Sequence, residues 1–284
     1  MQVLTRVEEV TQRVIDVKRS GKRIAVVPTM GALHEGHLSL VDRAADSADF
    51  VIVTIFVNPA QFSPTEDLSK YPRTLEGDLQ KLRQRNVGMV FVPGENEIYP
   101  RGFSTVVDPP EIARSLEGTF RPTHFRGVTT VVLKLLNIAR ADVAVFGQKD
   151  FQQAAVIRRM VIDLNVPCQI IVAPIARDPD GLAMSSRNRY LSPDDRNRAL
   201  AIRRSLLKAR ASILNLPGQP SAKISQLVRD ELTAAGIQEI DYAVAVDPET
   251  FEPQSVVAAP VAILIAVRVG TTRLIDNELI EASE

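Results

Sequence analysis

The first half of this chain repeats one unit: a short run of apolar, largely β-branched residues, then a turn, then a helical pattern. The runs expected to form strands cover residues 24–27, 50–56, 89–92, 143–146 and 169–173. Helical spacing of apolar residues predicts helices over 36–48, 75–86, 128–139 and 151–164. Strands that are apolar along their whole length, with helices between them, indicate an α/β fold: a Rossmann-like parallel sheet with helices on both faces.

The pattern changes at a run of turn-forming residues over 177–181. Two long helical patterns follow, at 193–214 and 222–235, and then three β-like runs, at 240–246, 261–267 and 271–275. Gly270 separates the last two runs and suggests a hairpin. We therefore expect two domains, a Rossmann-like domain over 1–176 and a smaller α+β C-terminal domain over 177–284.

Charge and cysteine content narrow the classes to which the chain can belong. It carries 34 basic and 34 acidic residues, and this zero net charge argues against a broad nucleic-acid-binding surface. A single cysteine, Cys168, cannot form an internal disulfide, which fits a reducing cytoplasm. The longest apolar stretch, 256–267, is far shorter than the roughly 20 residues of a membrane span. We expect a cytoplasmic protein that binds neither nucleic acid nor a membrane.

Two histidines lie between the first expected strand and the first expected helix. The N-terminus of a helix exposes unpaired N–H groups and attracts phosphate. Gly36 allows a ligand to approach, and imidazoles at His34 and His37 can donate hydrogen bonds to phosphate oxygens that gain charge during transfer. Histidines three residues apart without a third ligand make a poor zinc site. The alternative, a capped helix start with two polar surface histidines, fits these four residues equally well.

Two further segments offer cationic and hydroxyl groups. Lys149 and Asp150 lie between an expected strand and helix, where Asp150 is a plausible N-cap and Lys149 could meet a phosphate. Ser185, Ser186 and Arg187 form a cluster of donors that suits a polyphosphate, next to a turn that could move as a lid. Taken alone, each segment is better explained as an ordinary loop or polar linker.

Neutral amides follow the second expected strand. Asn58 and Gln61 could bind hydroxyl and carboxylate groups of a small substrate, although Asn-Pro also occurs simply as a turn. Gln153, just inside a later helix, could face the same pocket. A basic loop over 121–127 holds the third histidine, His124.

Position links these segments. Three of them come directly after expected strands of one parallel sheet, whose carboxyl ends form the edge where such sheets bind ligands. Between residues 121 and 159 there are seven basic residues against two acidic ones, a local excess that can attract an anion although the total charge is zero.

Five ordered segments together resemble the pantoate–β-alanine ligase (pantothenate synthetase) family, within the superfamily of HIGH-motif nucleotidyltransferases. They cover residues 28–37, 58–62, 71–73, 147–150 and 184–188. His34 to His37 corresponds to the HIGH motif, and Met184 to Arg187 to a degenerate KMSKS motif. Both lysines of that motif are missing, because Ala183 precedes Met184 and Ser186 fills the second lysine position. Phosphate charge would then fall to Lys149 and Arg187.

The resemblance implies an ATP-dependent ligase that joins pantoate to β-alanine through a pantoyl adenylate, releasing pyrophosphate and AMP. It implies a catalytic group of His34, His37, Lys149, Ser185, Ser186 and Arg187. The ATP-binding residues would be these six with Met30, Gly147, Asp150 and Met184. The pantoate end would comprise Gln61, Gln153, Asn58, Tyr71, Arg121 and His124. Mg²⁺ would be bound mainly through the ATP phosphates, the C-terminal domain would be associated with closure and dimer formation, and the protein would be a homodimer.

Two other functions stay open at this point. One is a nucleotidyltransferase that adenylylates a phosphorylated metabolite, which would release pyrophosphate but no AMP. The other is a nucleotide-sensing module without turnover, which ATP would stabilise without being consumed.

Overall fold

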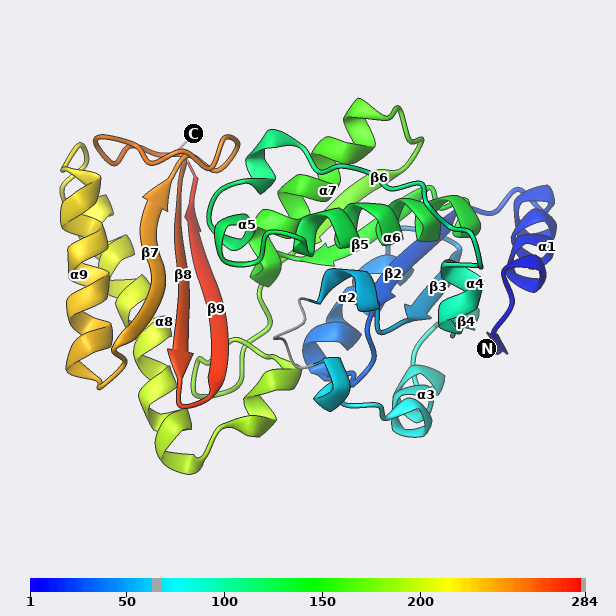
Figure 1. The fold of residues 1–284 in the computed structure, drawn as a ribbon, viewed down its shortest axis with the longest axis horizontal. Helices are drawn as coiled ribbons and strands as arrows, with labels where there is room; N and C mark the ends of the chain where they lie inside the picture. The colour runs from blue at the N-terminus through cyan, green and yellow to red at the C-terminus, as the bar shows by residue number, and fades with distance from the viewer. Residues whose placement is uncertain (63–67, 282–284) are drawn as a thin grey trace. The chain divides into compact units, whose positions relative to one another are not determined.

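The computed structural model describes residues 1–62 and 68–281, and the chain divides into two compact units. The first unit is Met1–Gln148 with Gln152–Pro174, and the second is Lys149–Phe151 with Ile175–Glu284. Figure 1 shows a sheet in each unit. Within the described ranges, no helix combines the length and the apolar character needed to cross a membrane.

The first unit is built on a parallel sheet of six strands, ordered β1-β4-β3-β2-β5-β6. Its strands are β1 (Gln2–Leu4), β2 (Ile24–Thr29), β3 (Phe50–Ile55), β4 (Met89–Phe91), β5 (Val143–Gly147) and β6 (Gln169–Ala173). All five expected strands are present, and the parallel sheet is confirmed. The central strand β2 lies between β3 and β5, so the chain continues to one side of it and later returns to the other.

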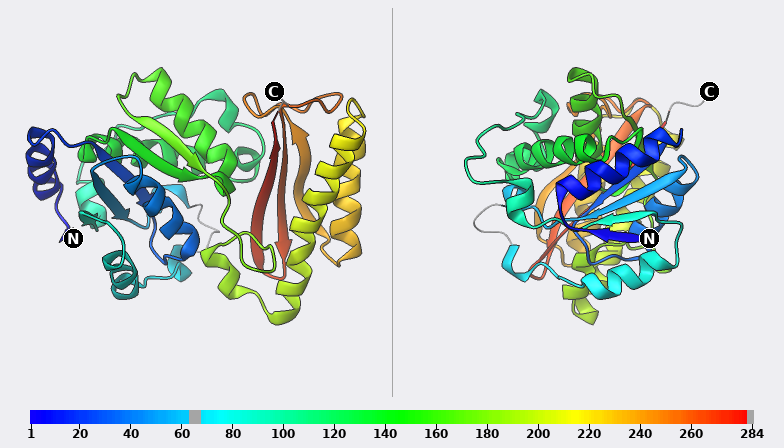
Figure 2. Two further views of the ribbon diagram at one scale, coloured as in Figure 1. Left: turned by 180° about the vertical axis from the view of Figure 1, so that it is seen from behind. Right: turned by 90° about the vertical axis from the view of Figure 1, so that its right-hand side faces the viewer.

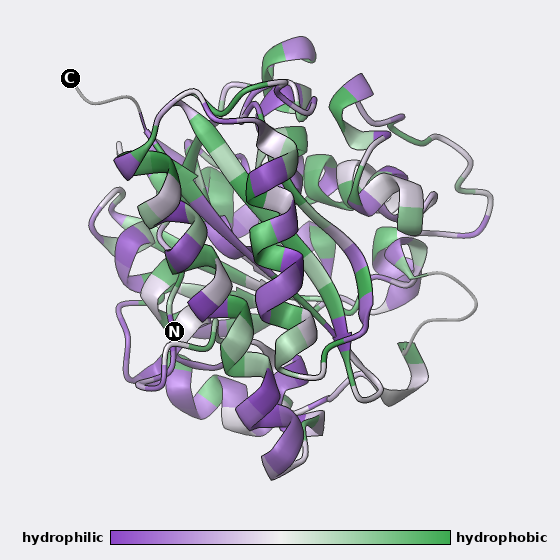
Figure 3. Ribbon diagram, turned by 90° about the vertical axis from the view of Figure 1, so that its left-hand side faces the viewer, coloured by the Kyte–Doolittle hydropathy of each residue, from purple (hydrophilic) through white to green (hydrophobic). Residues whose placement is uncertain are grey.

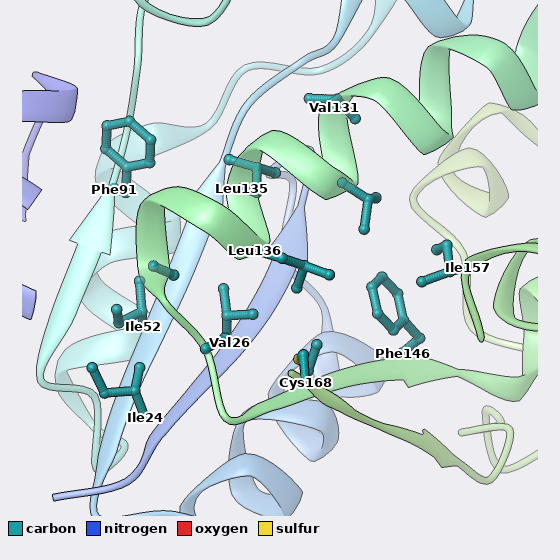
Figure 4. Close-up of a cluster of buried hydrophobic side chains, with 14 of the residues drawn as sticks. Ile24, Val26, Ile52, Phe91, Val131, Leu135, Leu136, Phe146, Ile157 and Cys168 are labelled. Carbon is teal, nitrogen blue, oxygen red and sulfur yellow. The ribbon is translucent and has the colours of Figure 1, made fainter. Parts of the chain in front are cut away.

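Helices cover both faces of this sheet. The helices of this unit are α1 (Val7–Arg19), α2 (Glu35–Ala45), α3 (Leu75–Arg83), α4 (Glu95–Ile98), α5 (Glu117–Phe120), α6 (His124–Ala139) and α7 (Phe151–Asp163). Successive residues of a strand point to opposite faces. Val26 accordingly packs in one apolar cluster with Leu136 of α6 and Ile157 of α7, as Figure 4 shows. Val27 packs in another with Val41 of α2.

Three differences from the sequence-based expectations are found in this unit. The expected turn at 28–31 begins later, because Pro28 and Thr29 still belong to β2. Pairing of β2 with β5 ends at Val26, so Pro28 lies where only β3 flanks the strand and its missing N–H is tolerated. The helix expected over 128–139 begins at His124. The first strand and helix, β1 and α1, were not predicted, although Val10, Val14 and Val17 of α1 are all buried in the core.

The second unit packs two helices, α8 (Pro193–Asn215) and α9 (Ser221–Ala234), with an antiparallel sheet of order β7-β8-β9 (Figures 1 and 2). Its strands are β7 (Glu239–Val246), β8 (Val261–Val269) and β9 (Thr272–Ile280). The hairpin between β8 and β9 turns at Gly270, whose φ is +57°. In Figure 3 hydrophobic and hydrophilic residues alternate along the helices, as expected for helices with one face on a core.

Strand β9 is longer than the expected run over 271–275. Its continuation includes Asp276, Asn277 and Glu278, polar residues that are all buried. Burial is tolerated because the charges are paired: Asp276 with Arg177, and Glu278 with Arg203 and Arg210.

Candidate functional site

The three segments expected at the ligand edge do leave the sheet there, because β2, β3 and β5 are parallel neighbours. After β2 the backbone turns through two residues with positive φ, Gly31 at +81° and Ala32 at +52°. Thr29 holds the beginning of this turn, since its hydroxyl donates to the carbonyl of Thr54 at 2.7 Å and accepts the N–H of Gly31 at 3.2 Å. The loop before His34 is therefore a defined, uncommon backbone conformation.

Helix α3 holds the rest of this loop. The carboxylate of Asp78 accepts the backbone N–H groups of Ala32 and Leu33, both at 2.8 Å. Lys81, one turn further along α3, donates to the carbonyl of Leu33. Asp78 is only 1% exposed. Asp78 was not predicted from the sequence, because a carboxylate in a helix with a polar face resembles any solvated one.

His34 and His37 are brought together at the start of α2. His34 is the N-cap residue and His37 lies in the first turn, with ring centroids 4.1 Å apart. The backbone N–H of His34 is directed to Nδ1 of His37 at 3.4 Å. Two imidazoles next to the N-terminus of an eleven-residue helix form a group suited to an anion.

Asn58, which follows β3, is buried and fully engaged with the protein. Its side-chain N–H groups donate to Oε1 of Gln61 at 3.1 Å and to the carbonyl of Gly127 at 3.2 Å. Its Oδ1 accepts the hydroxyl of Tyr99 at 2.7 Å and the N–H of Ala60 at 3.3 Å. An amide has two donors and two acceptor positions. Asn58 therefore orients its neighbours. It does not offer a substrate the free amide that was expected from the sequence.

Burial of Tyr99 raises the pKa of its hydroxyl to about 12, with Glu95 adding to the rise and the hydrogen bond with Asn58 opposing it. The hydroxyl therefore stays protonated at neutral pH and can keep donating to Asn58.

Gln61 connects three elements. Its Nε2 lies 3.0 Å from Sδ of Met30, in the loop after β2. Its main-chain carbonyl accepts a hydrogen bond from Arg121 at 3.4 Å and lies 2.9 Å from Nδ1 of His124. The structure therefore gathers five expected site residues around one point of the edge: Met30, Asn58, Gln61, Arg121 and His124.

Tyr71 and Gln153 are placed less closely. The ring of Tyr71 packs edge-on against Phe62, with centroids 5.9 Å apart, and Phe62 directly follows Gln61. Gln153 is partly exposed on α7. Its buried neighbour Gln152 donates to the carbonyls of Ile112 and Ser115, so it supports the loop before α5.

The remaining expected residues belong to the second unit, apart from Gly147 at the end of β5. Asp150 is the last residue of a 3-10 turn, Gln148–Asp150, that continues directly into α7. Since an N-cap has non-helical dihedral angles, the prediction of an N-cap at Asp150 is wrong. Nζ of Lys149 lies 3.8 Å from Oδ1 of Asp150, and the carbonyl of Lys149 accepts a hydrogen bond from Asn277 of β9 at 3.0 Å.

The segment 184–188 follows a short hairpin that β9 also supports. Arg177 and Ala183 form an antiparallel bridge in this hairpin, and Arg177 makes two hydrogen bonds to Asp276, at 2.7 and 3.0 Å. Ser185 caps the 3-10 helix Ser186–Tyr190 by accepting the N–H of Arg187 at 3.2 Å. In the described part of the chain, no three His, Cys, Asp or Glu side chains gather as a metal site.

The chain was compared with known proteins. The model of a family described as pantoate-beta-alanine ligase matches residues 2–279. The chain is similar to pantothenate synthetase 1 of Bradyrhizobium diazoefficiens, with 47% identity over all of this chain and 99% of that one.

Two solved structures are also similar. Pantothenate synthetase from Thermus thermophilus has a TM-score of 0.93 and 40% identity, with 99% of this chain and 100% of that one covered. Pantoate-beta-alanine ligase from Francisella tularensis, complexed with beta-gamma ATP and beta-alanine, has a TM-score of 0.79 and 35% identity, with 98% and 97% covered. Both the sequence motifs and the fold therefore point the same way, and the chain belongs to the pantoate-beta-alanine ligase family.

Proposed function

We propose that this protein condenses pantoate with β-alanine at the expense of ATP, forming pantothenate through a pantoyl adenylate. The observation that carries the proposal is found at the carboxyl edges of β2 and β3, in a chain of this family. His34 and His37 lie there beside each other, and Asn58, Arg121 and His124 surround Gln61; these four residues are called the Gln61 cluster. Open α/β sheets bind their ligands at this edge.

In the first step a pantoate carboxylate oxygen attacks the α-phosphorus of ATP, and the bond to the bridging oxygen of pyrophosphate breaks. No protein nucleophile is needed, so the protein contributes positioning and stabilisation of charge. His34 and His37 are assigned to the phosphate oxygens, where the N-terminus of α2 adds a partial positive charge. In the second step the β-alanine amine attacks the acyl carbon and AMP leaves.

The Gln61 cluster is assigned to pantoate. Gln61 would bind the hydroxyl and carboxylate groups with Gln153, while Asn58 holds the Gln61 side chain through its 3.1 Å hydrogen bond. Tyr71, Arg121 and His124 are assigned to the pantoate and β-alanine end. Arg121 is itself steadied by Glu117, whose carboxylate lies 3.7 Å from its guanidinium.

The second unit supplies the phosphate-binding cations in this proposal. Lys149, Ser185, Ser186 and Arg187 would hold the β- and γ-phosphates, while Met30, Gly147, Asp150 and Met184 would line the nucleoside. The residues assigned to ATP carry imidazole, ammonium, guanidinium and hydroxyl groups, which suit phosphate oxygens, whereas Mg²⁺ prefers carboxylate and other oxygen ligands. Mg²⁺ would therefore be held by phosphate oxygens and water, and would neutralise the departing pyrophosphate.

The domain roles follow from the same assignment. Residues 1–176 would bind ATP and pantoate, and residues 177–284 would act as the lid and dimer-associated domain of a cytoplasmic homodimer. Light scattering tests the dimer directly.

The decisive experiment measures AMP released from ATP and Mg²⁺ with pantoate and β-alanine, each omitted in turn. We expect AMP release only when both acid and amine are present. Pyrophosphate without AMP when both pantoate and β-alanine are present would instead support adenylylation of another acceptor. Thermal stabilisation by ATP with no AMP from any combination would support a nucleotide sensor and refute the ligase.

A further inference from the structure

The loop after β2 carries an uncommon backbone that something must hold in place. Positive φ at Gly31 is ordinary for glycine, but at Ala32 it costs free energy, since the left-handed region crowds Cβ. Gly31 also has little room: a Cβ added there would lie 3.1 Å from Cγ2 of Ile55 and 3.2 Å from Oδ2 of Asp78. The conformation that leads into His34 therefore depends on contacts from outside the loop.

Asp78 supplies these contacts with both carboxylate oxygens. Oδ2 accepts the N–H of Ala32, and Oδ1 accepts the N–H of Leu33 and the hydroxyl of Thr74 at 3.2 Å. Hydrogen bonds to an ionised acceptor are the strong ones, and this carboxylate is buried. Lys81 donates a hydrogen bond to the carbonyl of Leu33. Side chains of α3 therefore bind both N–H and C=O groups of this loop.

We infer that Asp78 is a positioning residue of the reaction: its carboxylate fixes the loop Gly31–Leu33 and thereby the place of His34 and His37 at the ATP phosphates. The inference deepens the proposed function and rests on it for the role of the histidines. Asp78 acts through the backbone of the loop.

Asp142 provides a matched control. It lies at the amino end of β2, where its carboxylate accepts the N–H of Ile24 at 2.7 Å. Asp78→Asn and Asp142→Asn thus make the same chemical change to carboxylates that hold the two ends of one strand. In Asp78→Asn the new amide turns one acceptor into a donor, which leaves the N–H of Ala32 or of Leu33 without its partner. In Asp142→Asn the remaining oxygen can still accept the N–H of Ile24, but without the charge that strengthens this hydrogen bond.

Steady-state kinetics and hydrogen exchange test the inference together. We expect Asp78→Asn to lower kcat/KM for ATP by about tenfold to about a hundredfold, the size of one lost hydrogen bond to a charged group. Amide exchange at Ala32 or Leu33 should quicken by at least about tenfold. Asp142→Asn should quicken exchange at Ile24, leave Ala32 and Leu33 unchanged, and keep kcat/KM for ATP within about twofold.

A second variant covers the case in which Asp78→Asn does not fold. Lys81→Met removes only the contact with the carbonyl of Leu33, so we expect a smaller fall in kcat/KM for ATP and faster exchange confined to 31–33. Folded Asp78→Asn with wild-type kcat/KM and exchange would overturn the inference. So would rapid exchange of Ala32 and Leu33 in the wild type. The exchange arm needs no turnover, so an inactive wild type would refute the proposed function and still report on Asp78.

Discussion

Strand β2 is held by an aspartate at each end, and the two ends serve different purposes. At the amino end Asp142 accepts the first N–H of the strand and pairs with Lys18, with its side chain 32% exposed. At the carboxyl end Asp78 is buried and accepts two N–H groups of a loop that no regular element would stabilise. A hydrogen bond from a backbone N–H to an aspartate thus pairs the first residue of the strand at one end and stabilises a strained loop at the other. Burial and backbone strain gather where the candidate chemistry lies.

Substitutions at the two ends of the sheet should differ most in their effect on kcat. We expect His37→Ala, at the carboxyl edge, to lower kcat by at least roughly a hundredfold, as for the loss of one donor to developing charge. Lys18→Met, at the amino edge, should change kcat by less than about twofold, because Lys18 pairs with Asp142. Pantoate-dependent AMP formation measures both. Equal losses in the two variants would remove the distinction between the edges.

A glycine pair tests how tightly the carboxyl edge is packed. A Cβ at Gly127 would lie 2.2 Å from the carbonyl oxygen of Ala60 and 2.7 Å from the nitrogen of Gln61, whereas at Gly77 it meets nothing within 4 Å. We expect Gly127→Ala to lower the free energy of unfolding by about 2–3 kcal/mol and to raise KM for pantoate. Gly77→Ala, within α3, should raise the free energy of unfolding by up to about 1 kcal/mol. Urea unfolding measures the free energy of unfolding, and pantoate titrations measure KM. If Gly127→Ala changes neither quantity, α6 can move away from the backbone of Ala60 and Gln61.

The contribution of Asp142, at the amino end of β2, to the free energy of unfolding should depend on pH. Partial burial would raise the pKa of Asp142, but hydrogen bonds from Lys18 and the N–H of Ile24 outweigh it and hold that pKa below its ordinary value. A lowered folded pKa adds stability above the ordinary value, and this stability is lost as pH falls through the folded pKa. Asp142→Asn should therefore cost roughly 1 kcal/mol at pH 7 and progressively less below about pH 4. A difference from wild type that stays constant in urea unfolding between pH 7 and pH 3 would contradict this.

Cys168 should give the smallest effect. It lies just before β6, and burial, with the charge of Asp142, raises the pKa of its thiol to about 12 against the opposing effect of Lys18. We expect alkylation by iodoacetamide at pH 8 to be far slower than that of a free thiol, because the thiolate is the nucleophile. Cys168→Ala should leave kcat within about twofold. Rapid alkylation with loss of AMP formation would extend the functional region to the amino edge.

Residues that follow strands were predictable, and residues that act across the fold were not. Continuous apolar runs located β2, β3 and β5, so the edge that carries His34 and Gln61 could be inferred from the order of strands and turns along the chain. Asp78 lies 45 residues after Leu33 and looks like one more polar residue of an amphipathic helix. Only packing of α3 onto the loop buries it.

Asn58 and Gln61 show the same limit at short range. Both are amides after one strand, but four hydrogen bonds within the protein occupy Asn58. The polar end of β9 was missed for a related reason, since Asp276 is tolerated in a strand only with Arg177 paired to it. Pairing partners distant in sequence decide such cases, and periodicity carries no information about them.

The hydrogen bonds that hold the loop after β2 also have a consequence for the order in which the protein can fold during synthesis. Every contact described for it, from Thr29, Thr54, Asp78 and Lys81, lies between residues 29 and 81. The strand that flanks β2 on its other side, β5, begins only at Val143. A ribosome that has released the first hundred residues has therefore already supplied every hydrogen-bonding group described for this loop, more than forty residues before β5 can pair with β2.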